Sequence, residues 1–375
     1  MPRFAPFGDS PAGRFGLGCA QLGNLYSAID DERAAATVEA AWQCGARLFD
    51  TAPHYGLGLS ERRLGAALRG RPRSQYLVST KVGRRLVPDP GGAGRRDPDG
   101  FDVPADHRRV WDFSADGVRR CLDASLDRLG LDHVDLVLLH DPEEHQSTAL
   151  DQAYPALRAL RDQGVVRAIG VGSKHVGVLE RFVTETDLDA VLVAGRYTLL
   201  EQTAATTLLP ACRRRGVLVL LAGVFNSGLL AVARPTADLP YEYQKAPPAV
   251  LARAVAMAQL CQRHGTTLPS AAIAFSAAHP AVHALVLGAA GADQVRRNAA
   301  LLDAAPPAGL WPALAGAGLL PAGVPLPGPG SLPGPGSLPG PGSLPGPGSL
   351  PGPGSLPGPG SLPGLGPSSG TGSAG

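Results

Sequence analysis

Four side chains that can exchange protons stand at or just beyond the ends of three consecutive predicted strands. Asp50 closes the run RLFD, Tyr55 follows it by five residues, Lys81 lies in STKV, and His140 closes VDLVLLH. The carboxyl ends of parallel strands can meet at one rim, where a charged group costs several kcal/mol unless it is paired. We therefore expect an ion pair between Asp50 and Lys81, beside Tyr55 and His140, in a proton-transfer site.

Lysine usage supports this interpretation, because the 34 basic residues include only Lys81, Lys174 and Lys245 among arginines. An ammonium beside Tyr55 is expected to lower the pKa of the phenol from about 10 toward neutrality, so that it can exchange protons. Asp50 would orient Lys81, and His140 would hydrogen-bond the reacting oxygen. Singly, the four have plainer interpretations: a helix cap, an exposed loop ring, a strand-end charge and a buried histidine. Their matching positions on successive strands favour a shared site.

The elements that must position these residues alternate regularly between residues 14 and 304. The eight strand candidates are RFGLGCA from Arg14, RLFDTA from Arg47, YLVSTKV from Tyr76, VDLVLLH from Val134, VVRAIGVG from Val165, AVLVAG from Ala190, GVLVLLAG from Gly216 and HALVLGA from His283. Segments between them, such as ADGVRRCLDASLDRLG, have apolar residues at helical spacing and mostly end in Gly.

Eight near-continuous apolar strands, each followed by a helix, predict a (β/α)8 TIM barrel of the α/β class. A doubly wound sheet is the structural alternative. It would be expected to have a glycine-rich phosphate turn after the first strand, but the candidate turn, Gly16–Gln21, lacks the third glycine.

Composition excludes several functions. A net charge of +2 provides no basic stripe for nucleic acid, and no apolar run reaches the roughly 18 residues of a membrane span. The five scattered cysteines indicate neither disulfides nor a thiolate zinc site, and we expect a cytoplasmic protein. The stretch from His140 to His145 has metal-ligand residue types, but no second ligand cluster accompanies it, so no metal is expected.

The C-terminal sequence differs from the rest. Beyond Asp303 no charged residue occurs, and from Ser331 the hexamer SLPGPG is repeated five times before the variant SLPGLG. Such a segment cannot bury enough surface to offset its ordering entropy. We predict two parts: a barrel over residues 1–304 and a disordered low-complexity tail over 305–375.

The most specific motif, FDTAPHYGLGLSERRLGAAL from Phe49 to Leu68, resembles that of the aldo-keto reductases, and within them the aldose 1-dehydrogenases. The segments STK, LLHDP, AGRYTLLEQ and GVFNSGLLA extend the similarity over residues 14–304. The resemblance implies a (β/α)8 barrel whose catalytic residues are Asp50, Tyr55, Lys81 and His140. It implies oxidation of an aldose such as L-fucose or D-arabinose at C1 to the lactone, with Tyr55 as the proton acceptor.

The resemblance also implies a nicotinamide dinucleotide, NAD or NADP, at the barrel mouth. Its contacts would come from residues near the strand ends and on the last helix of the barrel: Gly18, Ser173, Lys174, Phe225, Gly288, Gln294 and Asn298. Lys174 stands where the family usually has an Asn for the carboxamide; alternatively, Ser173 suffices and Lys174 points to solvent. NAD is favoured because Ala289, Ala290, Gly291 and Gln294 offer no cation to a 2′-phosphate, although Arg296 or Arg297 could still reach it.

Two long insertions, Gly83–Trp111 and Phe225–Pro248, are expected to form walls of the substrate pocket. Trp111 would stack on a sugar beside Tyr55 and His140, while Tyr241 and Tyr243 lie in the second insertion. Both insertions could instead be solvated loops. Two functional alternatives remain: a dehydrogenase or reductase of a non-sugar alcohol or carbonyl such as pyridoxal, and a non-catalytic cofactor-binding module whose Pro-rich tail contacts a partner.

Overall fold

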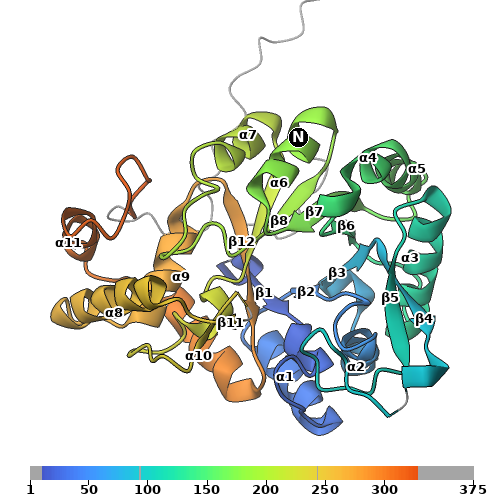
Figure 1. Cartoon of the computed structure of the whole chain (residues 1–375), viewed down its shortest axis with the longest axis horizontal. Coiled ribbons are helices and arrows are strands. Elements are labelled where there is room, and N and C mark those ends of the chain that lie inside the picture. Colours follow the sequence, from blue (N-terminus) through green and yellow to red (C-terminus); the bar gives the residue numbers. More distant parts are fainter. Residues whose placement is uncertain (1–10, 93, 243, 328–375) are drawn as a thin grey trace, which may run out of the picture. The chain divides into compact units, whose positions relative to one another are not determined.

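The computed structural model describes residues 11–92, 94–242 and 244–327, and their centre is a closed parallel barrel. Its strands follow the order β1-β12-β9-β8-β7-β6-β3-β2 (Figure 1). They are β1 Phe15–Gly18, β2 Leu48–Asp50, β3 Leu77–Val82, β6 Leu136–His140, β7 Ala168–Ser173, β8 Ala190–Ala194, β9 Leu218–Ala222 and β12 Val282–Gly288. Each coincides with one of the eight predicted strands. Because β1 pairs with β12, the sheet closes, and the doubly wound alternative is wrong.

Helices surround the strands, as Figure 1 shows. They are α1 Asp31–Gln43, α2 Leu59–Leu68, α3 Ala115–Leu129, α4 Gln146–Thr148, α5 Tyr154–Asp162, α6 Val176–Glu185, α7 Leu208–Arg215, α8 Pro248–Arg263, α9 Leu268–Ala278, α10 Ala292–Leu302 and α11 Leu310–Gly316. Shorter turns are η1 Pro11–Arg14, η2 Ala20–Gly23, η3 Arg73–Gln75, η4 Pro90–Gly92, η5 Glu143–His145, the π-helical η6 Ala149–Ala153 and η7 Asn226–Gly228. Side-chain caps define several starts: Ser114, for example, accepts the N–H of Gly117 at the start of α3.

Apolar side chains fill both sides of the strands. Leu48, Leu138, Leu220 and Val286 belong to a cluster inside the barrel, and a second, larger cluster packs the outward residues against the helices. This double burial explains why the strands are near-continuous apolar runs, the pattern from which we predicted a parallel sheet.

Buried carboxylates tie neighbouring strands together at the amino-terminal end of the barrel. Asp189, just before β8, accepts the N–H of Ile169 at 3.0 Å and pairs with Arg161 at 3.0 Å. Asp135, just before β6, accepts the N–H of Val78 at 2.8 Å in the same way. These aspartates lie at the end opposite the predicted site, so we expect them to act on stability.

The packed part of the chain extends beyond residue 304. We expected a low-complexity tail from residue 305 onward. Instead, α11 packs against α8, and its side chains Leu310, Trp311 and Leu314 are buried. Their spacing places three apolar side chains on one helical face, a signal concealed by the surrounding Pro, Gly and Ala. The SLPGPG repeat lies outside the described residues.

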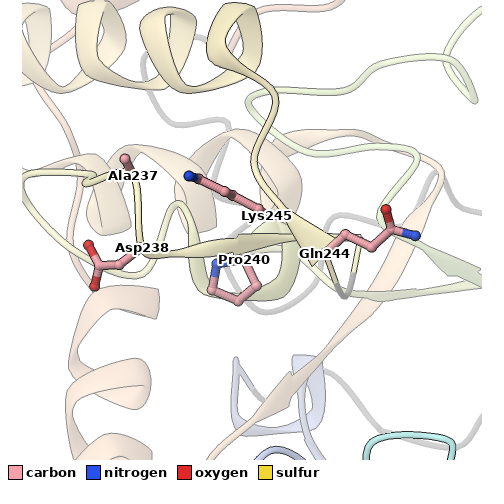
Figure 2. Close-up of a pocket in the computed structure, with 5 residues that line it drawn as sticks. All are labelled: Ala237, Asp238, Pro240, Gln244 and Lys245. Carbon is pink, nitrogen blue, oxygen red and sulfur yellow. The ribbon is translucent and has the colours of Figure 1, made fainter.

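The two insertions form short antiparallel pairs. In the first, β4 Arg84–Pro88 pairs with β5 His107–Trp111; in the second, β10 Pro240–Tyr241 pairs with β11 Gln244–Lys245. A hollow of about 520 Å³ on the second insertion is lined by Ala237, Asp238, Pro240, Gln244 and Lys245. Figure 2 shows these five residues. It contains none of the predicted site residues. Tyr243 lies outside the described residues.

In the part of the chain that the structure describes, no helix is long and apolar enough to cross a membrane. No group of three or more His, Cys, Asp or Glu residues in these ranges could hold a metal ion. All five cysteines are free thiols.

Candidate active site

The four predicted catalytic residues converge at the carboxyl end of the barrel, with the Lys81 ammonium at their centre. Its Nζ donates to Asp50 Oδ2 at 2.7 Å, to the Thr51 carbonyl at 2.9 Å and to Tyr55 Oη at 3.1 Å. The rings of Tyr55 and His140 lie edge to face with centroids 6.1 Å apart. An acid, an ammonium and a phenol are thus joined by hydrogen bonds beside an imidazole.

Close backbone packing fixes the loop that carries Tyr55. A side chain on Gly56, which has φ of +60°, would lie 2.2 Å from the Gly23 carbonyl oxygen, so only glycine allows this approach. Ser60, in the first turn of α2, donates to the Cys19 carbonyl at 2.7 Å and lies 2.9 Å from the Thr51 hydroxyl. The glycines and serine of the motif therefore hold the Tyr55 loop against the end of β1.

Burial controls the protonation of these groups. Burial lowers the pKa of Lys81, but Asp50 and Tyr55 outweigh it, so the pKa lies above its ordinary value. Burial raises the pKa of Tyr55, and Lys81 opposes the rise without cancelling it. Our expectation that the pKa of this phenol falls toward neutrality is therefore wrong for the protein alone, because the ring is more deeply buried than the sequence indicated. Burial, then Arg84 and Lys81, lower the pKa of His140 well below 6.5, so it is neutral.

Three further residues lie in this cluster, and the sequence analysis missed them. His54 has its ring 5.5 Å from that of His140 and 6.0 Å from that of Tyr55. Asp141 forms an ion pair with Arg84, and its Oδ2 lies 3.6 Å from His140 Nε2. His54 and Asp141 are chain neighbours of Tyr55 and His140, which is the signal that could have identified them.

Comparison with known proteins is consistent with this arrangement. A model of the aldo/keto reductase family matches residues 14–307. The chain belongs to this family. Its members are NAD(P)-dependent oxidoreductases, and this chain is one of them. D-threo-aldose 1-dehydrogenase of Pseudomonas sp is 49% identical over 313 residues, which cover 82% of this chain and 94% of that protein. Pyridoxal 4-dehydrogenase of Microbacterium luteolum is 35% identical over 322 residues, 81% of this chain and 94% of that protein.

Solved structures agree with the family assignment. An aldo-keto reductase of Bacillus halodurans in its holo form is 25% identical, with a TM-score of 0.62 over 78% of this chain and 88% of that one. The glycerol dehydrogenase of Gluconobacter oxydans, 23% identical with a TM-score of 0.66 over 82% of this chain and 93% of that one, shows the fold alone. The (β/α)8 barrel predicted for this aldo/keto reductase is confirmed.

Two glycines and one buried amide adjoin Asp50 at the carboxyl end of the barrel. In register, Gly18 at the end of β1 lies between Asp50 and Gly288, the last residue of β12. A side chain at Gly288 would lie 2.8 Å from Gln21 Oε1, a buried acceptor with no hydrogen-bond partner among the described residues. The narrow glycine rim and this unsatisfied amide fit a ligand that donates hydrogen bonds, as the carboxamide of nicotinamide does.

The α10 residues predicted to contact the cofactor hold the loop after β12. Gln294 Oε1 accepts the N–H of Ala290 at 2.7 Å, and Asn298 Nδ2 donates to the Gly288 carbonyl at 3.3 Å. Arg33 of α1 donates from Nε to the Ala290 carbonyl at 2.7 Å. The sequence analysis found no cation in this loop itself, but the fold brings one from α1.

Ser173 and Lys174 have different surroundings. Ser173, at the end of β7, is buried, accepts the N–H of His175 at 2.8 Å and contacts Glu143. Lys174 Nζ lies 3.8 Å from Glu242 in the turn between β10 and β11, with its side chain 46% exposed. Lys174 is therefore partly exposed beside the second insertion, and its role toward the carboxamide stays a prediction.

The remaining predicted contacts lie on the insertions. Phe225 follows β9 and is half-buried. Trp111 stands opposite Arg84 in the β4–β5 pair, with its ring 4.4 Å from the Arg84 guanidinium. Because Arg84 also contacts Asp141, this pairing brings Trp111 next to the site, still 45% exposed.

Proposed function

We propose that the protein is an aldose 1-dehydrogenase that oxidises the C1 hydroxyl of a sugar such as L-fucose or D-arabinose to the lactone, within carbohydrate metabolism. The observation that carries this proposal is the contact of one ammonium, Lys81 Nζ, with both Asp50 and Tyr55 Oη. The 49% identity to D-threo-aldose 1-dehydrogenase supports the substrate class.

The side chains divide the proton chemistry among them. Tyr55 Oη takes the proton of the C1 hydroxyl in oxidation and returns it in reduction. Lys81 stabilises the phenolate, and Asp50 keeps Lys81 charged and in place. Neutral His140 is the group we propose to hydrogen-bond the reacting oxygen; its Nδ1 is buried and has no hydrogen-bond partner among the described residues. The nicotinamide dinucleotide, when bound, accepts the hydride from C1 or donates it.

The raised pKa of Tyr55 bears on the direction of the reaction. At neutral pH the phenol is mostly protonated, which suits a proton donor. Oxidation needs the phenolate, so its rate is expected to rise with pH. Lys81 limits this handicap because it opposes the effect of burial.

We propose that the cofactor is held by Gly18, Gly288, Ser173 and Phe225. NAD is favoured because no residue from 289 to 291 is charged, and Arg33, exposed beside Ala290, is the cation we propose to set how much NADP is accepted. The Arg33→Ala variant should raise the NAD-over-NADP ratio of kcat/KM severalfold. An unchanged ratio would remove Arg33 from this role.

The decisive experiment mixes purified protein with NAD or NADP and a panel of aldoses, pyridoxal and simple alcohols, and follows the absorbance of the reduced cofactor. Turnover of an aldose that is abolished by Tyr55→Phe would support the proposal. Turnover of pyridoxal alone would favour the second candidate, supported by the 35% identical pyridoxal 4-dehydrogenase. Cofactor binding without turnover would favour the non-catalytic module. For either enzyme, we propose a cytoplasmic location, consistent with the five free thiols.

A further inference from the structure

One arginine outside the barrel strands joins several groups of the site. Arg84 begins β4, three residues after Lys81, and its guanidinium forms an ion pair with Asp141. Its Nη1 lies 3.4 and 3.5 Å from the two ring nitrogens of His54. Its flat face lies over the Trp111 ring at 4.4 Å. A single planar cation therefore has partners on three sides.

Asp141 connects this arginine to His140. It follows His140 directly and has φ of +45°, a left-handed conformation that is uncommon for a residue other than glycine. Its N–H donates to the Gly172 carbonyl at 2.9 Å, and its Oδ2 lies 3.6 Å from His140 Nε2. The carboxylate is thus held between the imidazole and the guanidinium.

We propose that Arg84 is a positioning residue, which holds Asp141 and, through it, orients the imidazole of His140 toward the reacting oxygen. This proposal rests on the proposed function. Arginine is required because a planar fork can pair with a carboxylate while its face lies on an aromatic ring, whereas the compact ammonium of lysine cannot do both.

The charges around His140 give the proposal an independent readout. His54 and Tyr55 face it from the loop after β2, Lys81 from β3, Arg84 from β4, Arg109 from β5, and Asp141 from its own loop. After burial, Arg84 is the largest influence that lowers the pKa of His140. Its removal leaves Asp141 unpaired beside the ring, so His140 should then protonate at a higher pH.

Arg85 provides a matched control on the same strand. Neighbouring side chains in a strand point to opposite faces, and Arg85 Nε lies 3.5 Å from Asp112 Oδ2, away from Asp141. The Arg85→Met variant removes the same charge and a similar volume from the same hairpin. It should keep kcat and the titration of His140 at their original values.

The experiment compares Arg84→Met, Arg84→Lys, Asp141→Asn and the double variant Arg84→Met/Asp141→Asn in the full chain. We expect kcat for an aldose to fall about 10- to 100-fold in Arg84→Met, the scale of a misplaced reacting group, with the KM for cofactor unchanged. Arg84→Lys should not restore kcat. The double variant should lose no more than the greater single loss, because both changes break one chain of contacts.

Losses that multiply in the double variant would overturn the proposal, since Arg84 would then act independently of Asp141. Histidine-selective NMR of the protein without substrate supplies the second test, with the His140 signal assigned from a His140→Gln variant. A His140 titration that is identical in Arg84→Met, Arg84→Lys and the original protein would also overturn it. Because this readout needs no turnover, it decides the role of Arg84 even if no aldose is oxidised. If Arg84→Met does not fold, Arg84→Lys and Asp141→Asn serve the same comparison.

Discussion

Replacing Lys81 by methionine tests the ion pair on which the site depends. The side chains of Lys81 and Asp50 are 2% and 4% exposed, and Asp50 Oδ1 already has no hydrogen-bond partner among the described residues. Methionine fills a similar volume but leaves the Asp50 carboxylate buried and unpaired. Breaking a buried pair in this way costs about 3–5 kcal/mol of unfolding free energy, or roughly 6–20 °C in Tm.

A second substitution separates stability from catalysis. In the Lys81→Met/Asp50→Asn double variant the buried charge disappears, so most of the lost unfolding free energy should return. Activity should not return, because no ammonium then opposes the rise in the pKa of Tyr55 that burial causes. The kcat/KM for oxidation should stay about 10²- to 10⁴-fold below that of the original protein, the usual contribution of general acid–base catalysis.

The assays are thermal unfolding and initial rates with the preferred aldose, measured between pH 7 and 9. The folded pKa of Lys81 is raised, so its contribution to stability is complete below its unfolded value of about 10.4 and is lost only as pH rises through the folded value. The stability difference should therefore be constant over this range. A double variant no more stable than Lys81→Met, or full activity in either variant, would refute the reasoning.

Three further outcomes are expected. Trp111→Ala should raise the KM for the sugar about tenfold with little change in Tm, because the ring is 45% exposed and adjoins the site through Arg84; equal KM values would remove it from the pocket. Asp189→Asn should cost about 1–3 kcal/mol in chemical unfolding while leaving kcat unchanged, because this carboxylate holds Ile169 and Arg161 at the far end of the barrel; a lower kcat would contradict the division of roles. Ending the chain after residue 327 should preserve Tm and kcat, whereas ending it after 304 removes the buried Trp311 and should lower Tm; equal Tm values for the two truncations would show that α11 adds no stability.

The barrel could be predicted because its signal is local and repeated. Each strand, such as VDLVLLH before His140, is an apolar run buried on both faces, and each helix pattern ends near a glycine or a cap. The helix α11 could not be found in this way, because it has only 7 residues within a stretch of Pro, Gly and Ala. Its existence depends on the surface of α8 and on the Phe275 ring, 6.3 Å from Trp311, which are distant in the sequence.

The site could be predicted only as far as chain position determines direction. Strand ends placed Asp50, Lys81 and His140 at one rim, and their contacts follow from parallel register. Arg84 lies three residues after Lys81, but its contact with Asp141 depends on the β4–β5 hairpin, and Arg33 reaches the Ala290 carbonyl from α1. The strand and helix pattern of the sequence shows neither contact. The pKa of Tyr55 was predicted in the wrong direction for a related reason: the sequence showed the ammonium, but not how much water the fold removes from the phenol. Lys81 therefore opposes the rise in the pKa of Tyr55 that burial causes. Because burial also lowers the pKa of Lys81 itself, the buried ammonium depends on Asp50 to stay charged more than an exposed lysine would.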